Sequence, residues 1–214
     1  MTGMWIVWDW NGTLLDDVDA CVSALNDMLS RRSLPNVDRE FFRRSFSFPA
    51  RGFYDRIGLS VPDSEWDALA REYHDAYRSK RFSLNPLARA ALDAAKAAGA
   101  RQGILSALRS DYLADDIERF GIGGYFEKIV GSDNLDGASK AVCAARLGAS
   151  LAGERTVLVG DSIHDKEAAD AMGAEFVAFG GGSHAPERLA PFGPLAATLP
   201  DAVAIALSLV GKQV

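Results

Sequence analysis

Five polar residues follow or lie within short apolar runs of the sequence, where an α/β fold would place catalytic groups. Asp9 follows WIVW, Ser106 lies within GILSA, and Asp161 follows VLVG. Lys140 begins a helical pattern after the KIVG run, and Asp165 comes four residues beyond Asp161. Each of them alone could be a helix cap or a surface group. Because parallel strands of an open sheet end at one edge, however, the five are expected to converge there.

These residue types suit phosphoryl transfer. Clustered acids repel one another and need a cation, and hard oxygen ligands favour Mg²⁺. Asp9 could attack phosphorus and form an aspartyl-phosphate. Lys140, Ser106 and the cation would offset the charge that builds up on the phosphoryl oxygens. The Asn11-Gly12 pair gives a tight turn that would bring backbone N–H groups close to the ligand.

The elements that would position these residues are short apolar runs separated by helical patterns. The runs do not alternate cleanly with polar residues, which is typical of strands buried on both faces of a parallel sheet. They are MWIVW (4–8), GILSA (103–107), KIVG (128–131), TVLVG (156–160) and EFVAF (175–179). The alternation of apolar runs with helical patterns along the chain predicts an α/β fold with a doubly wound, parallel, five-stranded sheet and a Rossmann-like core.

Residues 16–82 interrupt this alternation and are predicted to form an all-helical insertion. One apolar stripe at helical spacing runs from Val18 to Leu29, and another runs from Trp66 to Tyr77. Between them lies FFRRSFSFPARGFYDRIG, whose dense aromatic residues we interpret as a small helical core and not a ligand pocket. Residues 1–15 and 83–214 are expected to form the α/β core.

Composition narrows the function classes further. Hydrophobic residues make up 48% of the 214 residues, which excludes a disordered chain, and the net charge is −6. No long basic run appears, so neither nucleic acid nor a membrane is an expected partner. No apolar segment approaches the ~18 residues of a membrane span. The cysteines, Cys21 and Cys143, form no CxxC motif and are interpreted as reduced thiols of a cytoplasmic protein.

Four segments, in order, resemble the motifs of the haloacid dehalogenase-like (HAD) superfamily. They are DWNGTLLDD, LSAL, SKAVCAARLG and VLVGDSIHDKEAADAMG, and the resemblance covers nearly the whole chain. The helical insertion of residues 16–82, directly after the first motif, is similar to the cap of the phosphoglycolate phosphatase-like branch. The resemblance implies a Mg²⁺-dependent phosphatase that acts on a small phosphorylated metabolite. Assembly is expected to be as a monomer or a small homo-oligomer.

The same resemblance implies a role for each of the five polar residues. Asp9 would be the nucleophile and a metal ligand. Ser106 would donate a hydrogen bond to the phosphate, and Lys140 would offset the negative charge of the phosphate. Asp161 would bind Mg²⁺, and Asp165 would be a further ligand or would hold metal-bound water.

Asn11 departs from the family pattern. The phosphatases of the family carry an Asp two residues after the nucleophile, and that acid protonates the leaving group and later deprotonates water. An amide does neither, and general acid–base help is typically worth ~10²–10⁴-fold. The backbone carbonyl of Asn11 could still bind the metal, and Thr13 would still order the loop. Asp16, Asp17 and His164 are close enough in sequence to replace the acid, although each is interpreted as a surface or capping group.

Three functions therefore remain open at the level of sequence. The first is a phosphomonoester hydrolase, slowed by Asn11 or specialised for good leaving groups. The second is a catalytically impaired phosphate-binding or regulatory protein of the same fold. The third is another HAD reaction such as phosphonate cleavage, which would need an imine-forming lysine such as Lys80. Arg51, in the FPARG turn, is the candidate that would meet an anionic substrate tail, although an exposed arginine on a helix of the insertion is the more common case.

Overall fold

Six parallel strands form the central sheet of the protein. The computed structural model describes residues 3–132 and 140–211. In spatial order the strands are β5 (Lys128–Ser132), β4 (Arg101–Arg109), β1 (Met4–Trp8), β6 (Arg155–Gly160), β7 (Glu175–Phe179) and β8 (Leu195–Ala196). Every neighbouring pair is parallel, and the chain winds outward from β1 in both directions. The predicted doubly wound α/β fold is confirmed.

The sheet has one strand more than the five predicted. The extra strand, β8, contains two residues and lies at the edge beside β7. It is held by backbone hydrogen bonds from Ala178 N to Pro194 O (2.9 Å) and from Gly180 N to Ala196 O (3.0 Å). A strand of two residues is too short to show a hydropathy pattern, so it could not be predicted from the sequence.

Alternate side chains of β1 enter apolar cores on opposite faces of the sheet. The elements around the sheet are α5 (Ala88–Ala97), α6 (Ser110–Phe120), η1 (Gly123–Tyr125), α7 (Lys140–Ser150), α8 (Ile163–Met172), α9 (Pro186–Leu189) and α10 (Leu199–Gly211). Ile6 and Trp8 share a core with α5, α6 and α10, and Trp5 and Val7 share the other with α7 and α8. All four side chains are fully buried, so β1 is fixed in the middle of the sheet.

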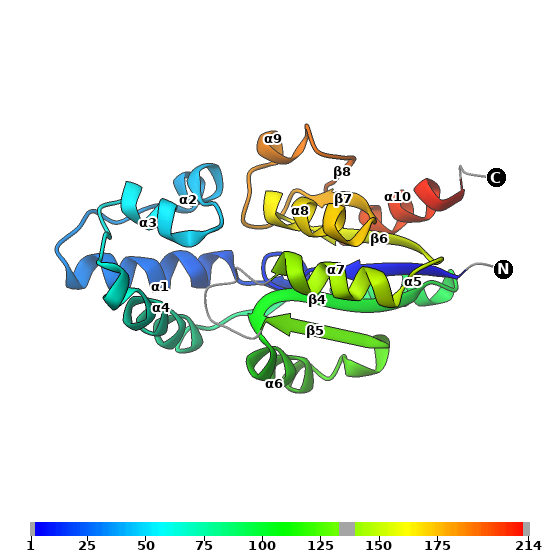
Figure 1. The fold of residues 1–214 in the computed structure, drawn as a ribbon, viewed down its shortest axis with the longest axis horizontal. Coiled ribbons are helices and arrows are strands. Elements are labelled where there is room, and N and C mark those ends of the chain that lie inside the picture. Colours follow the sequence, from blue (N-terminus) through cyan, green and yellow to red (C-terminus); the bar gives the residue numbers. More distant parts are fainter. Residues whose placement is uncertain (1–2, 133–139, 212–214) are drawn as a thin grey trace.

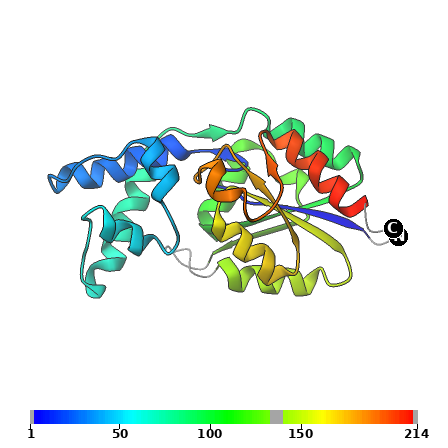
Figure 2. The same cartoon turned by 90° about the horizontal axis from the view of Figure 1, so that it is seen from above.

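The predicted all-helical insertion is present and has an apolar core of its own. Its helices are α1 (Val18–Arg31), α2 (Arg39–Ser45), α3 (Ala50–Arg56) and α4 (Asp63–Arg78). They pack around buried side chains such as Leu25, Met28 and Phe53. The chain leaves and re-enters the core through an antiparallel pair of two-residue strands, β2 (Leu15–Asp16) and β3 (Ser83–Leu84). Figures 1 and 2 show the insertion beside the end of the sheet to which the strands point.

Two arginines fasten the insertion to the core. From α2, the Arg43 guanidinium donates to the carbonyl oxygens of Gly182 (2.7 Å), Gly180 (2.6 Å) and His184 (3.3 Å). From α4, Arg78 Nη1 forms an ion pair with Asp116 Oδ1 on α6 at 2.6 Å. The insertion is therefore anchored to the core at two separate places.

Removing the Arg78 charge should destabilise the protein, because Asp116 is fully buried and its second oxygen has no hydrogen-bond partner. We expect Arg78→Met, which keeps most of the aliphatic stem, to lower the free energy of unfolding by about 2–3 kcal/mol. Urea denaturation monitored by circular dichroism measures this. The matched control is Arg81→Met at an exposed position nearby. Equal losses in the two variants would show that the ion pair contributes nothing.

Candidate active site

The carboxyl ends of β1 and β6 bring two of the predicted carboxylates together. Asp9 directly follows β1, and its N–H donates to Val159 O of β6 at 2.9 Å. Asp161 directly follows β6, and Asp165 lies in the first turn of α8. One oxygen from each of the three carboxylates fits within a cluster 4.8 Å across. The structure thus gathers Asp9, Asp161 and Asp165 at one edge of the sheet, as the sequence predicted.

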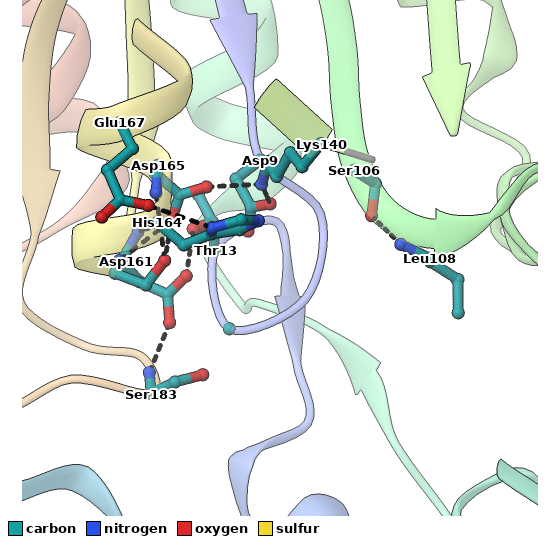
Figure 3. Close-up of polar contacts among 12 residues, drawn as sticks. Asp9, Thr13, Ser106, Leu108, Lys140, Asp161, His164, Asp165, Glu167 and Ser183 are labelled. Atoms are coloured by element: carbon teal, nitrogen blue, oxygen red, sulfur yellow. Dashed lines mark hydrogen bonds and ion pairs between the residues drawn. The ribbon is translucent and has the colours of Figure 1, made fainter. Parts of the chain in front are cut away.

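Lys140 lies among these carboxylates and pairs with two of them. It is the first residue of α7, and its Nζ donates to Asp9 Oδ1 and Asp165 Oδ1 (Figure 3). All four side chains are nearly inaccessible, with Lys140 2% exposed. Three buried acids around one ammonium leave an excess of negative charge that water cannot screen, so the cluster has the charge and the oxygen donors to hold a metal ion.

The environment shifts the pKa values of these three acids in different directions. Burial and the Asp165 charge raise the pKa of Asp161 to about 7. Burial and Asp165 also raise the pKa of Asp9, more than Lys140 lowers it. Burial acts in the same direction on Asp165, but Lys140 and the hydrogen bonds from Ser162 hold its pKa below the usual range. Asp165 is therefore the permanent counter-charge of Lys140, and Asp9 and Asp161 are the groups that a cation would stabilise.

Backbone and side-chain donors orient the carboxylates. Asp165 Oδ2 accepts from Ser162 N (2.9 Å), Ser162 Oγ (2.6 Å) and Asp161 N (3.1 Å), which forms a capping box at the start of α8. Asp161 accepts from Thr13 Oγ1 at 3.2 Å and from Ser183 N. The expected ordering role of Thr13 corresponds to a direct contact with the acid cluster. Ser183 was not among the predicted site residues, because it lies 22 residues from Asp161.

Gly12 allows the loop after β1 to pass close to Asp161. Its φ is +75°, a conformation that favours glycine. A Cβ added there would lie 2.2 Å from Asp161 Oδ2. The Asn11-Gly12 turn therefore has both a conformational and a steric reason for its glycine.

The Asn11 amide is fixed by Asp17 and Tyr77. Asn11 Nδ2 donates to Asp17 Oδ2 at 2.7 Å and to Tyr77 Oη at 3.0 Å, and Tyr77 Oη donates to the same Asp17 oxygen at 2.7 Å. The other Asp17 oxygen accepts from Gly12 N at 2.7 Å. Burial raises the pKa of Asp17, although these hydrogen bonds oppose the shift. Asp17 is not a surface group. It does occupy the N-cap position of α1, but its side chain makes no capping hydrogen bond and is instead a buried support of the Asn11 loop.

A cavity of about 150 Å³ opens above this cluster. On the core side Asp9, Asn11, Ser106, Lys140 and Asp161 line it. Ser106 lies on β4, and the strand order β4-β1-β6 places it on the opposite side of Asp9 from Asp161 (Figure 3). Its Oγ accepts from Leu108 N at 3.0 Å, which leaves the hydroxyl hydrogen for another acceptor.

His164 also lines this cavity, although it was interpreted as a surface or capping group. Its ring centroid is 4.9 Å from that of Phe48, and burial together with the Lys140 charge lowers the pKa of His164. Asp16, the third alternative acid, is exposed on β2 as expected. Neither the aromatic contact nor the burial of His164 could be found from local sequence, because Phe48 belongs to the helical insertion.

The structure does not bring Arg51 to the cavity. Its guanidinium donates to Val61 O at 2.9 Å, pairs with Asp63 at 2.7 Å and lies 5.2 Å from the centroid of the Trp66 ring. These contacts all lie within the insertion, and Arg51 is not among the residues that line the cavity. The candidate contact between Arg51 and a substrate tail is therefore absent from this structure, since the side chain has nearer partners.

Comparison with known proteins agrees with this geometry. The sequence profile of the family described as haloacid dehalogenase-like hydrolase matches residues 6–179, so the chain belongs to this family. The chain is similar to the phosphoglycolate phosphatase of Caulobacter vibrioides, with 26% identity over 77% of this chain and 74% of that protein. It is equally similar, at 26%, to a protein named "Probable phosphatase IndB" of Dickeya dadantii, over 86% and 84% of the two chains.

The fold is shared with solved structures of the same kind. A predicted phosphatase from Clostridium acetobutylicum superposes with a TM-score of 0.80 at 18% identity, covering 97% of this chain and all of that chain. A predicted phosphoglycolate phosphatase from Haemophilus somnus gives 0.73 at 18% identity, covering 96% and 98%. The predicted membership of the HAD superfamily and the likeness to its phosphoglycolate phosphatase-like branch are confirmed.

The raised pKa of Asp161 has a consequence for stability. Between about pH 5 and 7 the unfolded chain has already lost the Asp161 proton, whereas the folded protein still binds it, so this group makes the fold less stable as the pH rises. We therefore compare the free energy of unfolding of Asp161→Asn with that of wild type in the presence of a metal chelator. The difference, variant minus wild type, should increase with pH by at most about 1.4 kcal/mol per pH unit. Urea denaturation at several pH values measures the difference.

The comparison with Asp161→Asn removes contributions that both proteins share. One is from His184, whose pKa burial and Arg188 lower to about 4 and which acts in the opposite direction. Another is from Asp165, whose lowered pKa affects stability only below the unfolded value near 3.8. A divalent cation should reduce the pH dependence of wild type by replacing the proton. A difference that stays constant with pH would show that Asp161 does not titrate in this window.

Proposed function

We propose that the protein is a Mg²⁺-dependent phosphomonoester hydrolase that acts on a small phosphorylated metabolite through an aspartyl-phosphate on Asp9. The observation that carries the proposal is the position of Asp9. It lies at the base of a cavity, beside a lysine and two further buried carboxylates. The family and the similarity to phosphatases of other organisms support the same reaction class.

The residues present fit a magnesium ion. Three acids face one ammonium, and oxygen donors are the ligands that Mg²⁺ prefers. Asp9, Asp161 and the backbone carbonyl of Asn11 would hold the ion. Asp165 would act on the ion indirectly, since its oxygens already accept hydrogen bonds from Lys140 and Ser162. Bound Mg²⁺ would supply charge neutralisation for the phosphoryl oxygens.

The chain's own groups divide the remaining work. Asp9 attacks phosphorus, and the P–O bond to the leaving group breaks. Lys140 offsets the charge on the transferring phosphoryl group, and the Ser106 hydroxyl donates to one of its oxygens. Water then cleaves the aspartyl-phosphate and restores Asp9. The helical insertion covers the cavity and limits the entry of other water during these steps.

Asn11 supports a second candidate, a phosphate-binding or regulatory protein that turns over slowly or not at all. Its amide cannot transfer a proton, and both of its N–H groups already donate to Asp17 and Tyr77. Phosphonate cleavage has less support, because Lys80 Nζ pairs with Asp27 and does not line the cavity. Among the helices of residues 3–132 and 140–211, none combines the length and apolarity needed to cross a membrane.

A phosphate-release screen over a metabolite panel, with and without Mg²⁺, tests the proposal. We expect turnover that needs Mg²⁺ and that falls at least about 10³-fold in Asp9→Asn, because the nucleophile is lost. The matched control is Asp170→Asn, which removes an exposed carboxylate of α8 that pairs with Lys166. Tight binding of phosphate and Mg²⁺ by wild type, with no turnover of any ester, would favour the binding protein instead.

Restoring an acid at position 11 tests the role of the amide. Asn11→Asp alone places a carboxyl within hydrogen-bonding distance of the buried Asp17, and the two acids would compete for one proton. We therefore expect the double variant Asn11→Asp/Asp17→Ser to gain more than Asn11→Asp alone. The gain should approach ~10²–10⁴-fold for alkyl phosphates and be much smaller for p-nitrophenyl phosphate. Equal gains on both esters would mean that proton transfer to the leaving group is not the missing step.

A further inference from the structure

The wall of the cavity opposite Asp9 is aromatic. It is contributed by α2, α3, α4 and the segment after α2, through Phe42, Phe46, Phe48, Tyr54, Trp66 and Tyr73. The sequence interpretation of this aromatic density as a small helical core is only partly right. Phe42 and Tyr54 are buried in the apolar core of the insertion and also border the cavity. The surface presented to the leaving group is therefore mostly ring faces and edges.

Positive charge is scarce on this wall. Among the described residues, Lys140 is the only lysine or arginine that lines the cavity, and it is held by Asp9 and Asp165 at the phosphoryl end. Arg51 points to Asp63, and Arg43 donates to carbonyls of the core. The wall does hold the imidazole of His74, whose ring packs edge-on against Tyr73 at 5.6 Å, and the imidazole of His164 lines the cavity from α8 of the core. Among the residues described around this cavity, a substrate with a carboxylate or a second phosphate would find no guanidinium or free ammonium.

The size of the cavity sets an upper limit of one ring on the leaving group. Its volume is about 150 Å³, and an apolar protein cavity of roughly that volume is known to hold a benzene molecule. Burying an aromatic ring against other rings is favourable through apolar contact and through offset or edge-to-face stacking. The same volume must also hold the phosphoryl group at Asp9 and Lys140, so a leaving group larger than one ring would not fit unless the insertion moved.

The chemistry at Asn11 selects the same kind of group. With an amide held by Asp17 and Tyr77 in place of an acid, the leaving oxygen must depart without a proton from that position. A phenol, with a pKa of about 10 as in tyrosine, leaves as its anion far more easily than an aliphatic alcohol. The aromatic wall and the missing acid are independent features, and both favour an aryl leaving group.

We propose that the substrate is a monocyclic aryl phosphate monoester without an anionic substituent. This inference rests on the proposed hydrolase function. Asp9 forms a bond to phosphorus while the phosphorus–oxygen bond to the ring breaks, and the electron pair leaves on the phenolate oxygen. The phenolate takes a proton from solvent. Water then attacks the aspartyl-phosphate, so the sum is one aryl phosphate and one water converted to one phenol and one hydrogen phosphate.

Binding is tested first with phosphonates, in which CH₂ replaces the bridging oxygen, because they report recognition without leaving-group reactivity. Benzylphosphonate imitates phenyl phosphate, 3-phosphonopropionate imitates phosphoglycolate, and ethylphosphonate imitates methyl phosphate. We expect benzylphosphonate to inhibit wild type with a Ki at least about tenfold lower than either of the others, from the added ring contacts. A lower Ki for 3-phosphonopropionate would overturn the inference.

Trp66 provides the matched variants. Trp66→Ala should raise the Ki of benzylphosphonate about tenfold and leave its ratio to ethylphosphonate near one, whereas Trp66→Phe should restore most of the preference. Circular dichroism and thermal unfolding establish that both variants fold. If Trp66→Ala weakens the two phosphonates equally, Trp66 does not contact the ring and the inference fails. Trp66→Phe carries the test if the alanine variant does not fold.

Turnover separates this inference from the proposed function. We expect kcat for phenyl phosphate to exceed that for benzyl phosphate by more than about tenfold, because only the phenol leaves readily without an acid. If phosphoglycolate is hydrolysed with a higher kcat/KM than phenyl phosphate, and Asp9→Asn abolishes this, the hydrolase stands and the aryl substrate is wrong. If no ester releases phosphate, the hydrolase is wrong and the aryl substrate falls with it.

Discussion

The structure of the site depends on three buried carboxylates with a single ammonium among them, which pairs with two of the three. Such a cluster is unfavourable by itself, because water cannot screen its charge. The surrounding fold offsets this cost with directed donors: Thr13 and Ser183 to Asp161, Ser162 to Asp165, and Lys140 to two acids at once. Each donor comes from a different segment, so the site forms only when the sheet, α7, α8 and the loop after β7 are in place together.

The sequence predicted the core side of this site because its residues lie at strand ends. Asp9 and Asp161 come directly after apolar runs, and Lys140 and Asp165 lie in the first turns of helices that follow strands. In a parallel sheet these positions meet at one edge whatever the lengths of the intervening segments. Thus the fold class and the acid cluster could be predicted, whereas β8 could not, since two residues carry no periodic signal.

The insertion side could not be predicted in the same way. Tyr77 reaches Asn11 across 66 positions, and Phe48 reaches His164 across more than a hundred, through helix packing that has no short sequence motif. Arg51 shows the opposite error. The sequence suggested that it contacts a substrate tail, whereas its partners in the structure are Asp63 and the Trp66 ring. The sequence does not show whether an aromatic residue of the insertion packs in its core or lines the cavity, because a ring at helical spacing can do both at once.

Arg43 connects the helical insertion to the loop of residues 180–184, which also contacts Asp161. The guanidinium on α2 grips three carbonyls of this loop, while Ser183 N of the same loop holds Asp161 and His184 N donates to Asp161 O at 3.2 Å. Lifting α2 away from the core therefore requires either breaking these bonds or dragging the loop with it. In the second case the Asp161 carboxylate would lose the Ser183 donor and the Asp161 backbone carbonyl would lose the His184 donor as the insertion opens. A movement of the insertion that keeps the Arg43 bonds would therefore also change how the Asp161 carboxylate is held.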